Sequence, residues 1–360
     1  MQQVKGSAVM LEYPYSAPDP DGSVRQVAPG VLWARMPMPM ALNHINVYLL
    51  EDDDGWYAVD TGLALEQVKR LWQTLVANEL KGKPLKGLIC THFHYDHAGL
   101  APWMTETFDI PLYMSFGEYL FMRSIGAERN PDMVGQLTSF YQRGGVPQQE
   151  IASIIKAVAK DPFIGHFPNT FNRLREGDQL AIGTRNWQVV IGEGHSPEHV
   201  CLWCEQEQLL IAGDQLLPEI SSNVLVNEIE PNGNPLALWL KSLERLETFP
   251  ANTIVLPAHG PVFRGIKPRS RALIEHHHTH LALLESAALR GLTLWQAMQV
   301  MFNRQLSSRK LGPVEKMLAL GETQAHLNYL YDAARLEKSN VRQQDGEQYI
   351  KLRQQDQKTQ

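Results

Sequence analysis

The feature that most constrains this chain is a cluster of metal-binding side chains directly after a predicted strand. Residues 85–91 form a short apolar run that predicts a buried strand, and His92, His94, Asp96 and His97 follow it at once. Neutral imidazoles and carboxylates are ligands of zinc, iron and manganese. His92 and His94 have the same parity and can converge on one ion, whereas Asp96 and His97 can face a second. The alternative is a surface loop that is rich in histidine by chance.

Three further ligand candidates also follow predicted strands. They are His195 in a Gly-His-Ser-Pro-Glu-His segment, Asp214 in Ala-Gly-Asp, and His259 in Pro-Ala-His-Gly. In α/β architectures, functional sites collect at the ends of strands and in the loops beyond them. This second group disfavours the chance loop and predicts a metal centre.

Strand and helix signals alternate along the first part of the chain. Residues 45–51 and 56–60 flank an Asp-Asp-Asp-Gly segment and indicate a hairpin, and apolar residues at helical spacing predict an amphipathic helix over 64–80. Further strands are predicted at 187–191, 199–204, 209–213 and 253–257. Two groups of this kind indicate helices packed outside two central sheets, an α+β fold.

Two other segments differ in character from these groups. Residues 115–168 are rich in aromatic residues, methionine, glycine and proline, which indicates a helical insertion. Its large side chains line an apolar pocket, pack the inserted helices together, or do both; they are Phe116, Tyr119, Phe121, Met122, Phe140 and Tyr141. Residues 293–302 and 322–336 predict helices, and Asp345-Gly346 predicts a hairpin turn. We therefore expect a catalytic domain over 1–265 and a helical linker with a winged-helix-like domain over 266–360.

A run of histidines at 276–280 also suggests metal binding. Helical spacing cannot bring His276, His277, His278 and His280 to a single ion. The segment instead predicts an amphipathic helix with Ile274, Leu281 and Leu284 turned inward. His44 and His326 are likewise interpreted as ordinary surface or core residues.

Composition limits the compartment and the partners. The net charge of −6 argues against a nucleic-acid-binding surface over the whole protein. The three cysteines cannot form a disulfide framework and suit a reducing cytoplasm. The apolar runs are too short for a membrane-spanning helix. We expect a cytoplasmic protein with a small-molecule substrate, no membrane segment and the capacity to form a homo-oligomer.

Taken together, the motifs resemble the metallo-β-lactamase superfamily, whose fold is an αββα sandwich. The resemblance covers about residues 30–265, and the five motifs occur in the family's order. It implies two divalent metal ions, zinc first, with iron or manganese as alternatives. The implied ligands are His92, His94 and His195 for the first ion, Asp96, His97 and His259 for the second, and Asp214 for both. It also implies an outer position for Asp60, whose carboxylate would orient a ligand histidine, and for His199.

The resemblance further implies a hydrolase. Two ions about 3.5–4 Å apart lower the pKa of a shared water, and the resulting hydroxide attacks a carbonyl or phosphoryl centre. Asp96, Asp214 and His199 are the expected catalytic residues. Flavodiiron proteins have Glu at the position of His94, and many true β-lactamases have Cys or Ser at that of Asp214. The set found here is similar to glyoxalase II and the lactonases, which favours a thioester, ester or lactone as substrate.

The C-terminal part bears on two alternative functions. The segment around Glu322 and His326 resembles the winged-helix appendage of one lactamase-like subfamily. Residues 291–360 contain ten Lys and Arg against seven Asp and Glu, a net of +3. A metal-dependent endoribonuclease that contacts RNA through this domain is the main alternative, although a packing or dimerisation role is favoured because no basic cluster stands out. A regulatory protein with little turnover is a third hypothesis, which the intact ligand set disfavours.

Overall fold

The computed structural model describes residues 11–40, 42–126, 131–158, 167–338, 347 and 349–351. The chain divides into two compact units that interleave along the sequence. Unit 1 comprises residues 1–129, 162–222 and 242–273, and unit 2 comprises 130–161, 223–241 and 274–360. The predicted continuous domains, 1–265 and 266–360, stay a prediction.

Unit 1 contains two sheets. The first has the order β1 to β7, antiparallel from β1 to β4 and parallel from β4 onward. Its strands are β1 (Val24–Ala28), β2 (Val31–Pro37), β3 (His44–Glu51), β4 (Trp56–Val59), β5 (Leu85–Ile89), β6 (Leu112–Met114) and β7 (Asn172–Arg173). The second has the order β13-β12-β11-β10-β9-β8. Its strands are β8 (Gln179–Ile182), β9 (Arg185–Gly192), β10 (His199–Cys204), β11 (Leu209–Gly213), β12 (Ile254–Pro257) and β13 (Phe263–Arg264).

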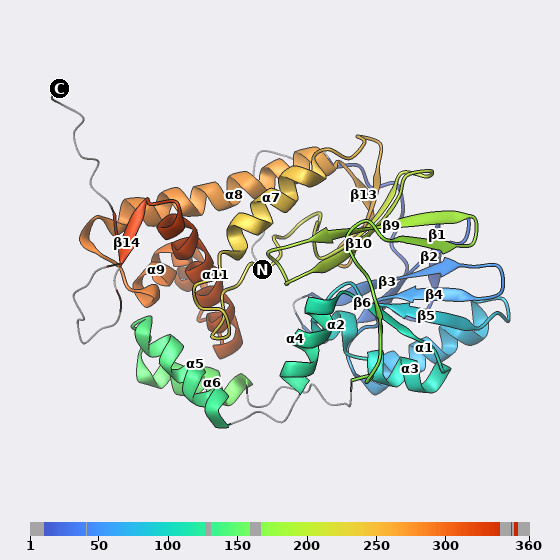
Figure 1. The fold of residues 1–360 in the computed structure, drawn as a ribbon, viewed down its shortest axis with the longest axis horizontal. Helices are drawn as coiled ribbons and strands as arrows, with labels where there is room; N and C mark the ends of the chain where they lie inside the picture. The colour runs from blue at the N-terminus through green and yellow to red at the C-terminus, as the bar shows by residue number, and fades with distance from the viewer. Residues whose placement is uncertain are drawn as a thin grey trace. The chain divides into compact units, whose positions relative to one another are not determined.

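Alternating side chains give the first sheet two apolar faces, and each face has its own core. On one face, Ala34 and Val47 pack with Trp72 of α1 (Glu66–Asn78) and Met104 of α3 (Ala101–Phe108). On the other face, side chains such as Trp33 meet those of the second sheet. Figure 1 shows β9 and β10 stacked over β3 to β5, with α1 and α3 beyond.

The outer face of the second sheet is covered by the end of α7 (Pro235–Leu246). Arg245 donates to the Ile191 carbonyl of β9 at 3.4 Å and pairs with Glu176 at 2.6 Å. Ser242 accepts a hydrogen bond from the Glu193 main chain at 3.0 Å. Helix, sheet, sheet and helix therefore follow one another, which confirms the predicted αββα sandwich.

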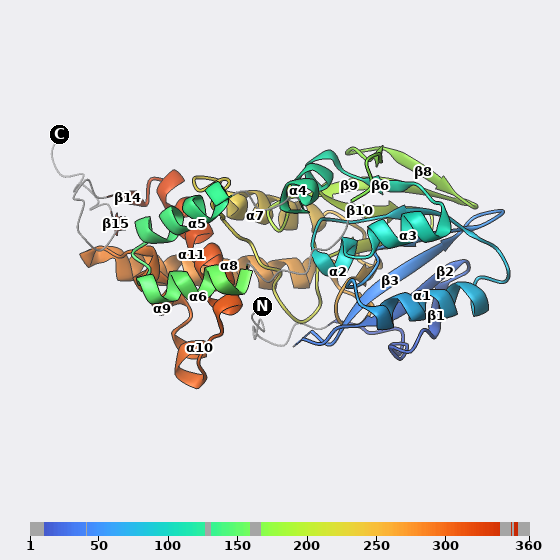
Figure 2. The same ribbon diagram turned by 90° about the horizontal axis from the view of Figure 1, so that it is seen from below.

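Unit 2 is mainly helical and is built around α11 (Pro313–Asp332), which is buried along most of its length. Helix α6 packs against α11, and Lys316 of α11 pairs with Glu150 of α6 at 2.6 Å. The other elements are α5 (Pro131–Arg143), α6 (Gln148–Val158), the part of α8 (Ile266–Ala287) from Ile274 on, the short helix Ala288–Arg290, α9 (Leu294–Met301), α10 (Asn303–Ser308), β14 (Leu336–Lys338) and β15 (Tyr349–Lys351). Figure 2 shows α5, α6, α9 and α11 gathered together.

The predicted C-terminal hairpin is present as an antiparallel pair of β14 and β15, whereas its predicted turn at Asp345-Gly346 lies outside the described residues. The winged-helix assignment stays a prediction. The predicted insertion at 115–168 contains α4 (Phe116–Gly126), which belongs to unit 1, and α5 and α6, which belong to unit 2. Among the described residues, no helix is both long and apolar enough to span a membrane.

Candidate metal centre

The histidine-rich loop lies at the carboxyl end of β5, beside the carboxyl end of its parallel neighbour β4. Asp60 follows β4, and its Oδ1 accepts a hydrogen bond from the Thr91 main chain at 2.8 Å. The main-chain N–H of Thr61 donates to the His97 carbonyl at 2.9 Å. Asp60 has φ 64°, a conformation that Asp and Asn tolerate better than most residues. These contacts fix the loop against the sheet.

His92, His94, His195 and Asp214 form the first ligand set, with their ligand atoms all within 4.8 Å of one another. Nε2 of His92 lies 2.7 Å from Nδ1 of His94 and 3.2 Å from Nε2 of His195. Nδ1 of His92 lies 3.1 Å from Oγ1 of Thr91, whose hydroxyl donates to Asp60. We therefore assign the proton of His92 to Nδ1, which leaves the Nε2 lone pair facing the other two rings.

Asp96, His97 and His259 form the second set, again within 4.8 Å. Nδ1 of His97 donates to Oδ2 of Asp60 at 2.8 Å, and Nδ1 of His259 donates to the His44 carbonyl at 2.9 Å. In the neutral form of both rings, Nε2 is then the nitrogen that carries the lone pair. Nε2 of His259 lies 3.2 Å from Oδ2 of Asp96, and that of His97 lies 3.8 Å from it.

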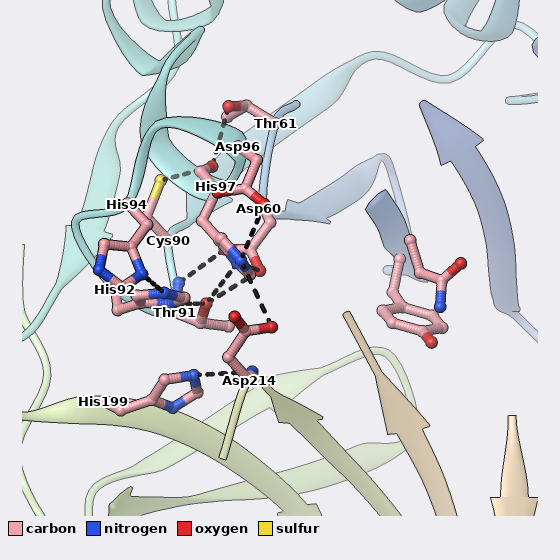
Figure 3. Close-up of polar contacts among 12 residues, drawn as sticks. Asp60, Thr61, Cys90, Thr91, His92, His94, Asp96, His97, His199 and Asp214 are labelled. Atoms are coloured by element: carbon pink, nitrogen blue, oxygen red, sulfur yellow. Dashed lines mark hydrogen bonds and ion pairs between the residues drawn. The ribbon is translucent and has the colours of Figure 1, made fainter. Parts of the chain in front are cut away.

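Asp214, at the end of β11, lies between the two sets. Its Oδ2 is 3.4 Å from Nε2 of His195, and its Oδ1 is 3.4 Å from Nε2 of His259 and 3.6 Å from Nε2 of His97. Figure 3 shows the Asp214 carboxylate beneath the His97 ring, with Asp60 behind that ring. The structure thus brings the seven residues expected as ligands to one place, with one oxygen of Asp214 facing each set.

Buried polar atoms without hydrogen bonds test whether this site fits metal ions. Nε2 of His97, Nε2 of His259 and Oδ1 of Asp214 are buried and form no hydrogen bond with any described residue. Leaving such atoms unsatisfied costs about 1–3 kcal/mol each. All three are lone-pair atoms that face one another, so a cation satisfies them together where a hydrogen-bond donor cannot. The donor set therefore fits divalent ions.

The electrostatic field of the site favours positive charge on the second set. Burial tends to lower the pKa of His97, but the carboxylates of Asp60, Asp96 and Asp214 outweigh it and raise that pKa well above the usual value. In the first set, burial and neighbouring imidazoles lower the pKa of His92 well below the usual value and that of His94 to about 3. Neutral imidazoles are the form that binds metal.

His199 lies behind the ligands. It is fully buried, and its Nε2 accepts a hydrogen bond from the Asp214 main chain at 3.1 Å. Gly213 makes this approach feasible, because its φ is 51° and a Cβ there would lie 2.6 Å from the His199 ring. This contact positions Asp214. The catalytic role expected for His199 stays a prediction, as do those of Asp96 and Asp214.

Sequence reasoning missed two residues that hold the centre together. Fully buried Glu118 of α4 accepts from the main-chain N–H of Phe93 at 3.0 Å and of Glu198 at 2.7 Å, so one carboxylate joins the loops that carry His94 and His195. His44, interpreted as ordinary, accepts from Gly260 at 3.2 Å through Nε2 and holds His259 through its carbonyl. Glu118 follows Phe116-Gly117 without a motif, and a carbonyl contact leaves no signal in side-chain identity.

The aromatic residues of the 115–168 segment differ in their surroundings. Tyr119 is buried, stacks on Phe171 with ring centres 3.9 Å apart and donates to the Pro168 carbonyl. Tyr141 is buried in unit 2. Whether the segment lines a pocket, packs its helices together or does both stays a prediction. The ring centre of Phe121 lies 4.4 Å from that of Phe93, which belongs to the histidine-rich loop.

Comparisons with known proteins agree with this geometry. Residues 41–259 match the Metallo-beta-lactamase superfamily, and residues 281–351 match the family described as Metallo-beta-lactamase-like, C-terminal domain. The chain is 25% identical over 313 residues to the probable metallo-hydrolase YqjP of Bacillus subtilis, covering 83% of this chain and 92% of that protein. It is 28% identical to the probable metallo-hydrolase YqgX of the same organism, covering 64% and 90%.

Solved structures match the fold of nearly the whole chain. A beta-lactamase domain protein from Burkholderia ambifaria superposes with a TM-score of 0.87 at 37% identity, covering 95% of this chain and 98% of that one. A metallo-beta-lactamase family protein from Thermus thermophilus shares the fold, with a TM-score of 0.75 at 24% identity over 91% of this chain and 100% of that one. With its family match, its fold and its histidine and aspartate cluster in agreement, this chain belongs to the metallo-beta-lactamase superfamily and is a metallo-hydrolase.

Proposed function

We propose that the chain hydrolyses a thioester, ester or lactone at a centre of two divalent ions, zinc first. The proposal rests on the position of Asp214, whose two carboxylate oxygens each face a different ligand set. It rests also on Nε2 of His97 and Nε2 of His259, which are buried without a hydrogen bond to any described residue. Two ions held there would supply a nucleophile from water at neutral pH and would stabilise the negative charge that develops on the substrate oxygen.

The chain's own residues prepare the site for that chemistry. Asp60 and the His44 carbonyl hold the protons of His97 and His259 on Nδ1, so that Nε2 of each ring is available. Ser222 donates to the Asp214 carbonyl at 2.5 Å, and His199 accepts from its N–H, so that both ends of this residue are fixed. A preorganised ligand set loses little entropy when it binds its ions.

The three cysteines do not supply a competing covalent route. Burial raises the pKa of Cys90 well above its usual value and also raises that of Cys201, and Cys204 shifts in the same direction. The thiolate is the nucleophilic form, so all three side chains are held in the unreactive form at neutral pH. This favours attack by water over an acyl-cysteine intermediate.

Two observations support an acyl substrate. Phe93 and Phe121 form a half-buried aromatic pair beside His94, whose ring centre lies 4.5 Å from that of Phe93. Such a wall suits an apolar acyl or lactone group. Among the relatives, a protein of Aspergillus fumigatus that is 23% identical over 227 residues is named an atrochrysone carboxyl ACP thioesterase; the match covers 62% of this chain and 39% of that protein.

The ribonuclease alternative requires basic side chains that are available to phosphate. Four basic side chains of unit 2 instead form ion pairs with carboxylates. The pairs are Arg309 with Glu315 at 2.6 Å, Lys316 with Glu150 at 2.6 Å, Arg335 with Glu285 at 2.5 Å and Lys338 with Glu347 at 4.0 Å. Ion pairing within the protein competes with phosphate binding. This arrangement favours a role in packing over RNA binding.

The test is a hydrolysis panel of thioesters, lactones, phosphodiesters and short RNAs with the wild type and Asp214→Ala. We expect acyl substrates to be turned over and the variant to lose more than about 100-fold of that rate, because removing even an outer partner of a ligand costs 10–100-fold. Elemental analysis should show that the variant has also lost metal. Cleavage of RNA with acyl substrates left intact would reject the proposal in favour of the nuclease.

A further inference from the structure

Unit 2 contains a second cluster of metal-binding side chains, apart from the centre in unit 1. His276 and His280 are four residues apart on α8, so their rings lie on one face of the helix, with centres 4.3 Å apart. Glu322 of α11 faces them. The ligand atoms of these three residues all lie within 4.8 Å of one another.

Two members of the cluster are buried. His280 is 9% exposed and Glu322 is 5% exposed. Nδ1 of His280 is buried and forms no hydrogen bond with the part of the chain that the structure describes. Burying a polar atom without a partner is unfavourable. A cation that binds between the carboxylate and the imidazole nitrogens would satisfy these buried polar atoms.

Neighbouring side chains fix how the two helices meet. Nδ1 of His326, four residues after Glu322, donates to the Glu322 carbonyl at 2.8 Å. Nε2 of His326 must then accept from Nδ1 of His277, which lies 3.2 Å away. The imidazoles of α8 and α11 are thus tied together at the level of the cluster, which holds His280 and Glu322 in register.

We propose that His276, His280 and Glu322 bind a third divalent ion, of the zinc type, within unit 2. Two imidazoles and one carboxylate favour zinc and its transition-metal neighbours over magnesium or calcium. Zinc–nitrogen bonds of 2.0–2.1 Å give ligand–ligand edges of about 3.3 Å in a tetrahedron. The ligand atoms all lie within 4.8 Å of one another, so binding needs a contraction of roughly 1.5 Å at most. Such an ion would join α8 to α11 and stabilise unit 2.

The test is a titration of the full chain with zinc alone, read by metal content after gel filtration and by the thermal midpoint. Glu322→Gln and His276→Gln remove one ligand each, and His278→Gln is the matched control because that exposed histidine lies on the same helix. We expect Glu322→Gln and His276→Gln to bind one zinc ion fewer than the control, or to bind it more than about 10-fold more weakly. Their hydrolysis of an acyl substrate should remain at the wild-type rate.

Two outcomes would overturn the proposal. The first is equal zinc content and equal affinity in all four proteins, which would make the cluster a metal-free hydrogen-bonded core. The second rests on the proposed two-ion centre and needs no variant: wild-type protein that takes up no more than two zinc ions at saturation then has no third site. If the glutamine variants fail to fold, as judged by circular dichroism, this wild-type stoichiometry decides.

Discussion

Asp60 performs three tasks with one carboxylate. It accepts from the main chain of Thr91, from the Thr91 hydroxyl at 2.9 Å and from Nδ1 of His97 at 2.8 Å. The first contact positions the loop, and the last decides which nitrogen of His97 is available to an ion. Geometry and protonation at the centre therefore depend on the same side chain.

Asp60→Asn separates these tasks. Asn tolerates the positive φ of this position, so the backbone stays unstrained, whereas the charge that holds the His97 proton is lost. We expect metal affinity to fall about 10–100-fold, measured by competition with a chromophoric chelator. Asp53→Asn, at an exposed position, is the control. Unchanged affinity in Asp60→Asn would mean that the carboxylate acts on the loop alone.

Residues of the centre were predictable where metal-binding side chains lie close together in the sequence or follow a predicted strand. His92, His94, Asp96 and His97 are recognisable because few other functions need four such ligands within six residues, and Asp60 because its motif follows a strand. Glu118 and His44 were not predictable. Glu118 acts on main-chain N–H groups and His44 through its own carbonyl, and neither contact requires a pattern in the sequence.

At the scale of elements, α1 and the strands of the sandwich were predictable from periodicity, whereas α11 was predicted only over 322–336. Helix α11 spans Pro313–Asp332 and buries polar residues such as Thr323 and Asn328 beside Leu320. A helix that is buried on most sides has no apolar stripe. Its start depends on a local cap instead, since Glu315 accepts from the main-chain N–H of Gly312 at 2.8 Å.

This cap makes the start of α11 sensitive to acid. Hydrogen bonds from Arg309 and from Gly312 lower the pKa of Glu315 to about 2. A carboxylate whose pKa is lowered by folding stabilises the fold above its unfolded pKa of about 4.5, and that contribution is lost as the pH falls toward 2. Because both side chains are more than a third exposed, solvent screening keeps the effect small.

Glu315→Gln should therefore lower the thermal midpoint slightly at pH 7, and the difference from the wild type should shrink between pH 4.5 and pH 2. Scanning calorimetry at several pH values measures this. A difference that stays constant over that range would show that the ionised carboxylate contributes nothing beyond its hydrogen bond to Gly312.

At the scale of the whole molecule, unit 2 is assembled from three separate stretches of chain. Ile151 and Ile154 of α6 are fully buried, and α6 packs against α11. The sequence carried no signal for this pairing, because an apolar face shows that a helix is covered but not by which partner. The boundary expected at residue 265 rested on sequence order alone.

Removal of residues 291–360 takes α9 and α11 away and exposes the apolar face of α6. Each buried isoleucine that becomes exposed costs about 1.5–3 kcal/mol, so we expect the truncated protein to aggregate or to change its oligomeric state. Light scattering after gel filtration measures this outcome. The ligands of the centre in unit 1 should remain, with metal content retained in whatever protein stays soluble. A monodisperse, monomeric truncated protein would refute the argument.

The pairing of Glu150 with Lys316 joins residues 166 positions apart in the chain. Ribosomes extend a chain by about 5–20 residues per second, so α6 leaves the exit tunnel roughly 8–30 s before α11 does. Throughout that interval its isoleucine face is exposed on a nascent chain. Each round of synthesis therefore includes a period in which this short helix is a target for chaperones, and the length of that period is set by the interleaved order of the two units.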